Sequence, residues 1–147
     1  MKIIGLSATK NRGKTTTLNK LIDLLALVAD NYEINRDFET KAYFEINGKG
    51  ITVCTPGDDR NYIRENIEFL MKSGHKTDLF VTPSHVRDET VKELAKFTRK
   101  ECATLVWITK ENNEAKNTII AARLFGLIIR EIYPEFDSSV YPAEENQ

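Results

Sequence analysis

A three-layer α/β fold is predicted for this chain because short apolar runs alternate with segments whose apolar residues recur at helical spacing. The chain has 147 residues, of which 41% are hydrophobic, so it is long enough for one core and too short for a second domain. We therefore expect a single domain with a mostly parallel five-stranded sheet and helices on both of its faces.

Five segments have the composition of strands, and they occupy residues 2–7, 40–46, 49–55, 78–82 and 103–109. Because Asn47 and Gly48 form a two-residue hairpin turn, the second and third strands are expected to be antiparallel neighbours. Pro83 is expected to end the fourth strand. If the strands are numbered in chain order, the expected sheet order is 2-3-1-4-5, with strand 2 antiparallel at the edge.

Four segments have apolar residues at helical spacing, and they cover residues 15–29, about 58–73, 88–99 and 114–133. The second of these helices has Asp58 or Asp59 as its N-terminal cap and Gly74 as its stop. Residues 30–39, between the first helix and the hairpin, are polar and irregular, and they are expected to form a surface loop.

Composition excludes several classes of protein. The formal net charge is -1, so no basic excess indicates a nucleic-acid partner. No apolar run has membrane-spanning length, and no secretory leader precedes the first strand. Cys54 and Cys102 are expected to be free structural thiols, which is typical of a reducing compartment. Together these features predict a cytoplasmic protein without a membrane partner.

The stretch that joins the first strand to the first helix has the residues of a phosphate-binding loop. Gly13 allows the backbone to approach phosphates closely, Lys14 can reach them, and the Thr15 hydroxyl can ligate Mg²⁺. The residues expected to line the phosphates are Ala8, Thr9, Lys10, Asn11, Arg12, Gly13, Lys14, Thr15 and Thr16. A buried strand that delivers such a loop to a helix N-terminus forms a complete polyphosphate site.

These residues resemble the Walker A motif of the P-loop NTPase superfamily, with Ala8 where the first glycine usually stands. The resemblance implies a P-loop nucleotide-binding domain over residues 1–140, followed by a short C-terminal tail at 141–147. It also implies that the ligand is a nucleoside triphosphate, ATP or GTP, with Mg²⁺ as cofactor. Lys14 then has a catalytic role, and Thr15 is a magnesium ligand.

A second resemblance is to the GTPase-like branch of that superfamily, in which a hairpin precedes a DxxG loop. Residues 54–57, Cys-Thr-Pro-Gly, are similar to that loop, with Gly57 at the nucleotide. Cys54 stands where the magnesium-orienting aspartate belongs, and a thiol is a poor ligand for Mg²⁺. Asp58 and Asp59 are the nearest acids, and one of them is expected to take this catalytic role, with Asp58 as the metal residue. The alternative is that Asp58 only caps the next helix.

The sequence lacks the NKxD pattern by which GTPases recognise guanine, so ATP is favoured over GTP. The resulting hypothesis is a small nucleotide switch that hydrolyses its nucleotide slowly and moves residues 30–39 and 55–59. One alternative is a small-molecule or nucleotide kinase in which Asp58 or Asp59 is the base. Another is a nucleotide-binding module that does not hydrolyse.

The last predicted helix, residues 114–133, carries apolar residues around most of its circumference. Packing against the sheet accounts for one of its faces. We therefore expect the other face to contact a second copy of the chain or a partner protein.

Overall fold

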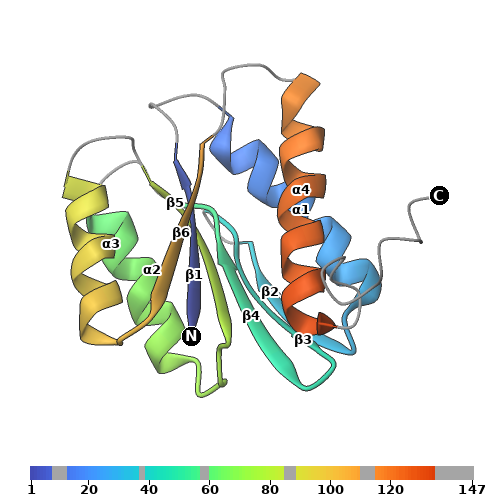
Figure 1. The fold of residues 1–147 in the computed structure, drawn as a ribbon, viewed down its shortest axis with the longest axis horizontal. Helices are drawn as coiled ribbons and strands as arrows, with labels where there is room; N and C mark the ends of the chain where they lie inside the picture. The colour runs from blue at the N-terminus through green and yellow to red at the C-terminus, as the bar shows by residue number, and fades with distance from the viewer. Residues whose placement is uncertain (8–12, 37–38, 57–59, 85–88, 110–114, 135–147) are drawn as a thin grey trace, which may run out of the picture.

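The computed structural model describes residues 1–7, 13–36, 39–56, 60–84, 89–109 and 115–134 (Figure 1). Its strands are β1 (Lys2–Ser7), β2 (Asn31–Asn35), β3 (Lys41–Ile46), β4 (Lys49–Cys54), β5 (Leu79–Ser84) and β6 (Thr104–Thr109). Its helices are α1 (Lys14–Val28), α2 (Arg60–Lys72), α3 (Glu89–Lys100) and α4 (Ala115–Ile132). The α/β class is confirmed, and the described helices begin and end within two residues of the expected positions.

The strands form one mixed sheet in the order β2-β3-β4-β5-β1-β6. β1 lies at the centre of the parallel part and pairs with β5 on one side and with β6 on the other. β3 is antiparallel to both β2 and β4, and β4 is parallel to β5. Consequently β1, β4, β5 and β6 all run in the same direction and end at the same edge of the sheet.

The predicted strand order was wrong in its centre. The prediction placed the first strand beside the strand that follows the hairpin, whereas β5 lies between β4 and β1. In its register β5 faces β1 along its whole length, from Lys2 opposite Leu79 to Ser7 opposite Ser84. Sequence patterns identify strands that are buried on both faces, but they do not say which buried strands are neighbours.

The sheet has six strands instead of the five predicted, because part of the expected 30–39 loop is β2. Tyr32 and Ile34 alternate with polar residues, and Ile34 packs against the main core. Tyr32 contacts Phe44 of β3, with ring centroids 6.2 Å apart. β2 therefore covers β3, which is antiparallel as predicted but does not form the edge. Because this segment is mostly polar, its alternation of apolar and polar residues was not recognised as a strand pattern.

Pro83 was predicted to end its strand, but β5 continues to Ser84. β4 pairs with β5 from Ile51 to Val53, and Val53 lies opposite Val81. Pro83 therefore lies beyond the last residue of β5 that β4 pairs with. A proline, which has no N–H to donate, is tolerated where a strand loses a neighbour.

Helices cover both faces of the sheet, as predicted. α1 and α4 pack side by side on one face, and α2 and α3 cover the other (Figure 1). The core under α1 and α4 is the larger, and it includes Leu21, Phe44 and Leu124. The core under α2 and α3 includes Ile3, Cys54 and Phe80. Among the residues that the structure describes, no helix combines the length and apolar character needed to cross a membrane.

Candidate functional site

Buried polar side chains gather at the edge of the sheet where the parallel strands end. Apart from Thr52, every buried polar or charged residue identified in the described chain lies at this edge or in the helix turns beside it. These residues are Ser7, Lys14, Thr17, Thr40, Thr55, Asn66, Thr82, Ser84, Thr90 and Asn117. In open α/β sheets, ligands bind beyond the carboxyl ends of the strands. This edge is therefore the candidate site.

Gly13 and Lys14 form the start of α1 at the centre of this edge. Gly13 has φ 77° and ψ 22°, a left-handed conformation that favours glycine, and Lys14 is the first helical residue. The carbonyl oxygen of Gly13 accepts the N–H of Thr17 at 3.0 Å, which closes the first helical turn. The helix N-terminus, with its partial positive charge, thus directly follows the residues after β1.

Lys14 is a buried cation, with only 5% of its surface exposed. Its Nζ donates a hydrogen bond of 2.9 Å to the carbonyl oxygen of Ser84, the last residue of β5. The partial positive charge of the helix N-terminus adds to that of the ammonium group, so an anion is favoured in this position. The described part of the sequence-predicted site therefore has its lysine beside the end of a central strand.

Thr15 and Thr16 follow Lys14 in the first turn of α1, and both are exposed. Their hydroxyl groups are accessible to a ligand at the helix N-terminus. Among the residues predicted for the loop, Ala8, Thr9, Lys10, Asn11 and Arg12 lie outside the described residues. Gly57, Asp58 and Asp59 also lie outside them. The structure thus brings together Gly13, Lys14 and the two threonines of the predicted site.

The strand order changes the expected position of the acidic residues. The prediction placed them after a strand that borders β1, but β4 is separated from β1 by β5. Neighbouring strands are about 4.8 Å apart, so the end of β4 is roughly 10 Å from the end of β1. The strand next to β1 ends instead in Thr82, Pro83 and Ser84.

Cys54, the residue that replaces the expected aspartate, points away from this edge. It is fully buried in the core under α2 and α3, together with Phe80 and Leu94. Burial in this apolar environment raises the pKa of the Cys54 thiol well above its usual value, so the thiol remains neutral. A neutral thiol in an apolar core is not a magnesium ligand, and Cys54 is a packing residue.

Thr55 joins the two segments that were predicted to move with the nucleotide. Its Oγ1 accepts the N–H of Thr40 at 2.9 Å and lies 3.0 Å from Oε2 of Glu39. Its own N–H donates to the carbonyl oxygen of Thr40 at 2.9 Å. The end of β4 and the residues before β3 are therefore linked through one buried side chain. No sequence motif indicates a role for Glu39.

Asn66 links α2 to the ends of two strands. Its Nδ2 donates to the carbonyl oxygen of Pro56 at 2.7 Å and to Oγ1 of Thr82 at 3.2 Å. Oδ1 of Asn66 is buried and has no hydrogen-bond partner among the residues that the structure describes. Asn66 thus holds the chain just after β4 against β5. No sequence pattern marks this residue, because an asparagine inside an amphipathic helix resembles any polar surface position.

Two further hydrogen bonds connect the site to its helices. Thr17 Oγ1 donates to the carbonyl oxygen of Gly13 at 2.9 Å and lies 3.2 Å from Oδ1 of Asn117 in the first turn of α4. Ser84 Oγ and Thr90 Oγ1 are 3.1 Å apart, which joins β5 to the first turn of α3. These hydrogen bonds therefore connect the first turns of α1, α3 and α4 to the buried polar side chains at this edge of the sheet.

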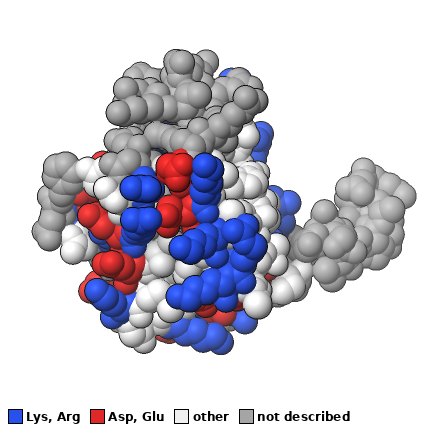
Figure 2. Space-filling model, turned by 90° about the vertical axis from the view of Figure 1, so that its left-hand side faces the viewer, with Lys and Arg blue, Asp and Glu red and all other residues white. Residues whose placement is uncertain are grey.

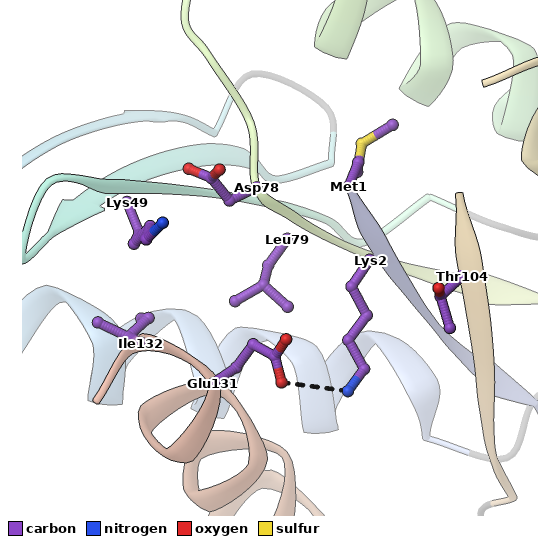
Figure 3. Close-up of a pocket in the computed structure, with 8 residues that line it drawn as sticks. All are labelled: Met1, Lys2, Lys49, Asp78, Leu79, Thr104, Glu131 and Ile132. Carbon is purple, nitrogen blue, oxygen red and sulfur yellow. Dashed lines mark hydrogen bonds and ion pairs between the residues drawn. The ribbon is translucent and has the colours of Figure 1, made fainter. Parts of the chain in front are cut away.

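The opposite edge of the sheet has a different character. A pocket of about 370 Å³ lies there, beside Lys2, Lys49, Asp78 and Glu131 (Figure 3). Lys2 Nζ pairs with Glu131 Oε2 at 3.2 Å, so cations lie beside carboxylates in this pocket. No group of three or more His, Cys, Asp or Glu side chains suited to a metal occurs within the described ranges. This pocket has no helix N-terminus with a buried lysine, such as Lys14 provides at the edge where the parallel strands end.

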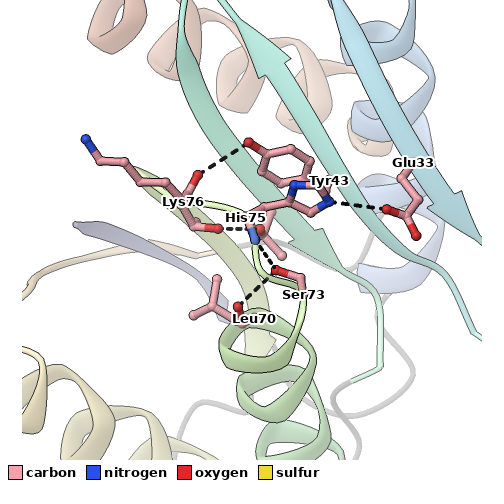
Figure 4. A network of polar contacts seen from close by, with 8 residues as sticks. Glu33, Tyr43, Leu70, Ser73, His75 and Lys76 are labelled. Atoms are coloured by element: carbon pink, nitrogen blue, oxygen red, sulfur yellow. Dashed lines mark hydrogen bonds and ion pairs between the residues drawn. The ribbon is translucent and has the colours of Figure 1, made fainter.

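A polar network near this opposite edge supports the fold. The His75 ring stacks on Tyr43, with ring centroids 4.0 Å apart, and its Nε2 lies 3.3 Å from Oε2 of Glu33 (Figure 4). The Tyr43 hydroxyl donates to the carbonyl oxygen of Lys76 at 3.4 Å. These contacts hold the segment before β5 against β2 and β3. They give His75 a structural role, so its position is explained without a catalytic one.

Comparison of the chain with protein-family models, curated proteins and solved structures found no match. The function of the protein is therefore inferred from the residues and geometry at the edge of the sheet that carries Lys14.

Proposed function

We propose that this protein binds a nucleoside triphosphate with Mg²⁺ and hydrolyses it slowly, acting as a small nucleotide switch. The observation that carries the proposal is the position of Lys14, a buried cation at the N-terminus of α1 that is joined to the end of the neighbouring strand. A helix N-terminus after a central parallel strand, with a lysine directed along the strand ends, is an arrangement suited to polyphosphate.

The described residues have distinct parts in this function. Lys14 would exchange its hydrogen bond to Ser84 for one to a phosphate oxygen, and Gly13 leaves space for the phosphates. Thr15 supplies a hydroxyl oxygen, the kind of ligand that Mg²⁺ prefers. Mg²⁺, when bound, would neutralise charge on the phosphates. Phosphoryl transfer needs mainly positioning and charge neutralisation, so these groups suffice for slow turnover.

The acids Asp58 and Asp59 remain the proposed partners of the metal. They follow β4, two strands from β1, which favours contact through magnesium-bound water. ATP is favoured over GTP, because the sequence after β5 lacks the guanine-recognition pattern.

The switch element in this proposal is smaller than the sequence suggested. Asn31–Asn35 form β2, which leaves residues 36–40 and 55–59 as the two responsive segments. The hydrogen bonds of Thr55 to Thr40 and Glu39 join these segments, so a change at one is transmitted to the other. This coupling supports a switch that changes its contact with a partner.

The direct test is calorimetric titration of the pure protein with ATP and GTP, with and without Mg²⁺. We expect binding by the natural protein, and its loss in Lys14→Ala. Lys20→Ala is the matched control, because Lys20 is an exposed lysine further along α1. Equal binding by the natural protein and Lys14→Ala would overturn the proposal.

A second candidate function is a nucleotide-binding module that does not hydrolyse. The burial of Cys54 favours it, because the position that should orient the metal holds a neutral thiol in the apolar core. A phosphate-release assay with the nucleotide that binds best separates the two. Release that depends on Mg²⁺ supports the switch, whereas tight binding without release supports the module.

A further inference from the structure

β6 has the composition of a buried strand, but none of its residues is fully buried. It reads Thr-Leu-Val-Trp-Ile-Thr and contains no charged residue, glycine or proline. β5 also begins with an apolar run, and it is buried along its whole length. Strands of parallel sheets have such continuous apolar runs because other elements cover them. The composition of β6 therefore indicates that it has a further neighbour.

One side of β6 is free to receive that neighbour. β6 pairs with β1 on one side, and no strand in the described part of the chain pairs with its other side. Leu105 packs against the core under α2 and α3, and Ile108 packs against the core under α1 and α4. In Figure 1, β6 lies between α3 and α4. The backbone N–H and C=O groups along its free edge can therefore pair with another strand.

The two edges of the sheet differ in how they discourage such pairing. β2, the opposite edge, reads Asn-Tyr-Glu-Ile-Asn, so its centre carries the charge of Glu33. Charged residues on an edge strand oppose pairing with another chain, and β6 has none. Pairing of β6 with β2 of another copy would bury the charge of Glu33 or leave it at the contact. Pairing of β6 with a second β6 meets no charge.

Trp107 enlarges the apolar surface at the free edge. This residue is 39% exposed, and it lies opposite Gly5 of β1. A Cβ atom added at Gly5 would be 2.5 Å from Cζ3 of Trp107, so the indole ring covers Gly5 and has no space to move inward. The exposed part of the ring can thus be covered only from outside the chain's own sheet. Tryptophan is among the residues that contribute most to protein interfaces.

The side of α3 next to the free edge is also uncharged. α2 lies on the other side of α3, where Arg64 pairs with Glu93 at 2.7 Å. Val91, Ala95 and Thr98 follow one another at helical spacing on the side turned away from α2, and all three are partly exposed. The outer face of α2 and α3, in contrast, has many charged side chains (Figure 2). The uncharged surface therefore includes β6 and the adjoining side of α3.

The size of this surface fits a second copy of the chain. At about 3.3 Å per residue, β6 is roughly 20 Å long, and a sheet with helices on both faces is roughly 30 Å thick. Each copy would bury about 600 Å², and the pair about 1,200 Å², which is the lower end of the range for specific interfaces. Because the net charge of the chain is -1, two copies repel each other only weakly.

We propose that two copies of this chain associate through antiparallel pairing of their β6 strands around a twofold axis, with Val106 and Trp107 near that axis. The two sheets then become one continuous sheet, and the α3 helices of the two copies lie on the same face of it. In a twofold contact each surface binds its own copy, so the free backbone groups of both strands are satisfied at once. This inference does not depend on the proposed nucleotide site.

The first test is sedimentation-velocity ultracentrifugation of the full chain. The buffer contains a reducing agent, because Cys102 is an exposed thiol. Concentrations from roughly 1 µM to about 200 µM bracket the micromolar dissociation constant expected for a small interface. We expect a reversible equilibrium between monomer and dimer. A monomer at every concentration would overturn the proposal, and so would continued growth beyond the dimer.

Hydrogen exchange locates the contact in the natural protein. Amides of β6 should exchange more slowly as the fraction of dimer rises, whereas amides of β2 should not change. Protection confined to another surface, such as the outer face of α4, would overturn the proposal. Slow exchange of all β6 amides already in the monomer would mean that another segment of the same chain covers this edge, and it would also overturn pairing between copies.

Trp107→Lys and Tyr32→Lys form a matched pair, because each introduces a lysine at an exposed aromatic residue of an edge strand. Trp107→Lys should raise the dissociation constant of the dimer by roughly tenfold or more, and Tyr32→Lys should change it by less than about twofold. Thr109→Lys, at an exposed position of β6, should also weaken the dimer and leaves the indole packing intact. Urea unfolding verifies that each variant is folded. Folded Trp107→Lys and Thr109→Lys proteins that both dimerise like the natural protein would exclude pairing through β6.

Discussion

Lys14 Nζ donates a 2.9 Å hydrogen bond to the carbonyl oxygen of Ser84, which lies 70 residues further along the chain. This bond joins the first turn of α1 to the end of β5. Ser84 is in turn 3.1 Å from Thr90 through their hydroxyl groups, so the contact extends to the first turn of α3. A ligand that attracts Lys14 would release the Ser84 carbonyl and affect both helices.

Replacing Lys14 by methionine should separate binding from stability. Methionine fills similar space and removes a buried charge, so the free energy of unfolding should change by less than about 2 kcal/mol. Nucleotide affinity should fall by roughly 10- to 100-fold, because a charge-assisted hydrogen bond to phosphate is lost. Urea unfolding and calorimetric titration measure the two effects. Unchanged affinity would remove Lys14 from the site.

Asp58→Asn and Asp59→Asn test the proposed metal partners. At least one substitution should suppress phosphate release by roughly 100-fold while nucleotide affinity stays within about threefold, because the acid acts on the metal in the transition state. Glu65→Gln on the exposed surface of α2 is the control. If both aspartate variants release phosphate at the natural rate, neither acid assists the metal.

Cys54→Asp is expected to destabilise the protein instead of restoring activity. The side chain would lie among Phe80 and Leu94, where an unpaired carboxylate costs about 3–5 kcal/mol in the free energy of unfolding. Cys54→Ala should cost about 1–2 kcal/mol, because it leaves only a small cavity. Chemical unfolding of both variants measures the difference. A stable Cys54→Asp protein with faster turnover would show that this position can serve the metal.

Thr55→Val removes the hydroxyl that joins the two responsive segments and keeps the shape of the side chain. The N–H of Thr40 then loses its acceptor, and we expect a loss of about 1–3 kcal/mol in stability. Hydrogen exchange at Thr40 should accelerate more than exchange in β1. Thr52→Val is the comparison, since Thr52 bonds to Thr77 away from the site at 2.8 Å. Equal acceleration in both variants would contradict a specific link.

Gly5→Ala should move the single tryptophan. A Cβ atom at Gly5 would lie 2.5 Å from Cζ3 of Trp107, whose side chain must therefore shift outward from its half-exposed position. We expect red-shifted fluorescence and a loss of about 1–3 kcal/mol in stability. Gly126→Ala is the control, because its nearest contact is 3.6 Å away, and it should leave the emission unchanged. Identical spectra would contradict this packing.

Local patterns predicted the part of the candidate site that depends on neighbouring residues. The start of α1 near Lys14 and the hairpin at Asn47 and Gly48 both occur as expected, because backbone conformation there depends on a few adjacent side chains. β2 was missed because Ile34 is its only partly buried residue and most of the neighbouring residues are polar.

The sequence by itself determined the α/β class, the helices and the position of Lys14 at a helix N-terminus, since these follow from residue periodicity and local turn chemistry. Only the tertiary structure decided that β5 lies between β1 and β4. It also decided that Cys54 points into the core, and that Asn66 and Thr55 connect the strand ends. Strand neighbours are chosen by packing of both faces over the whole sheet. No local sequence pattern indicates which strands are neighbours, because any two buried parallel strands present similar edges to each other.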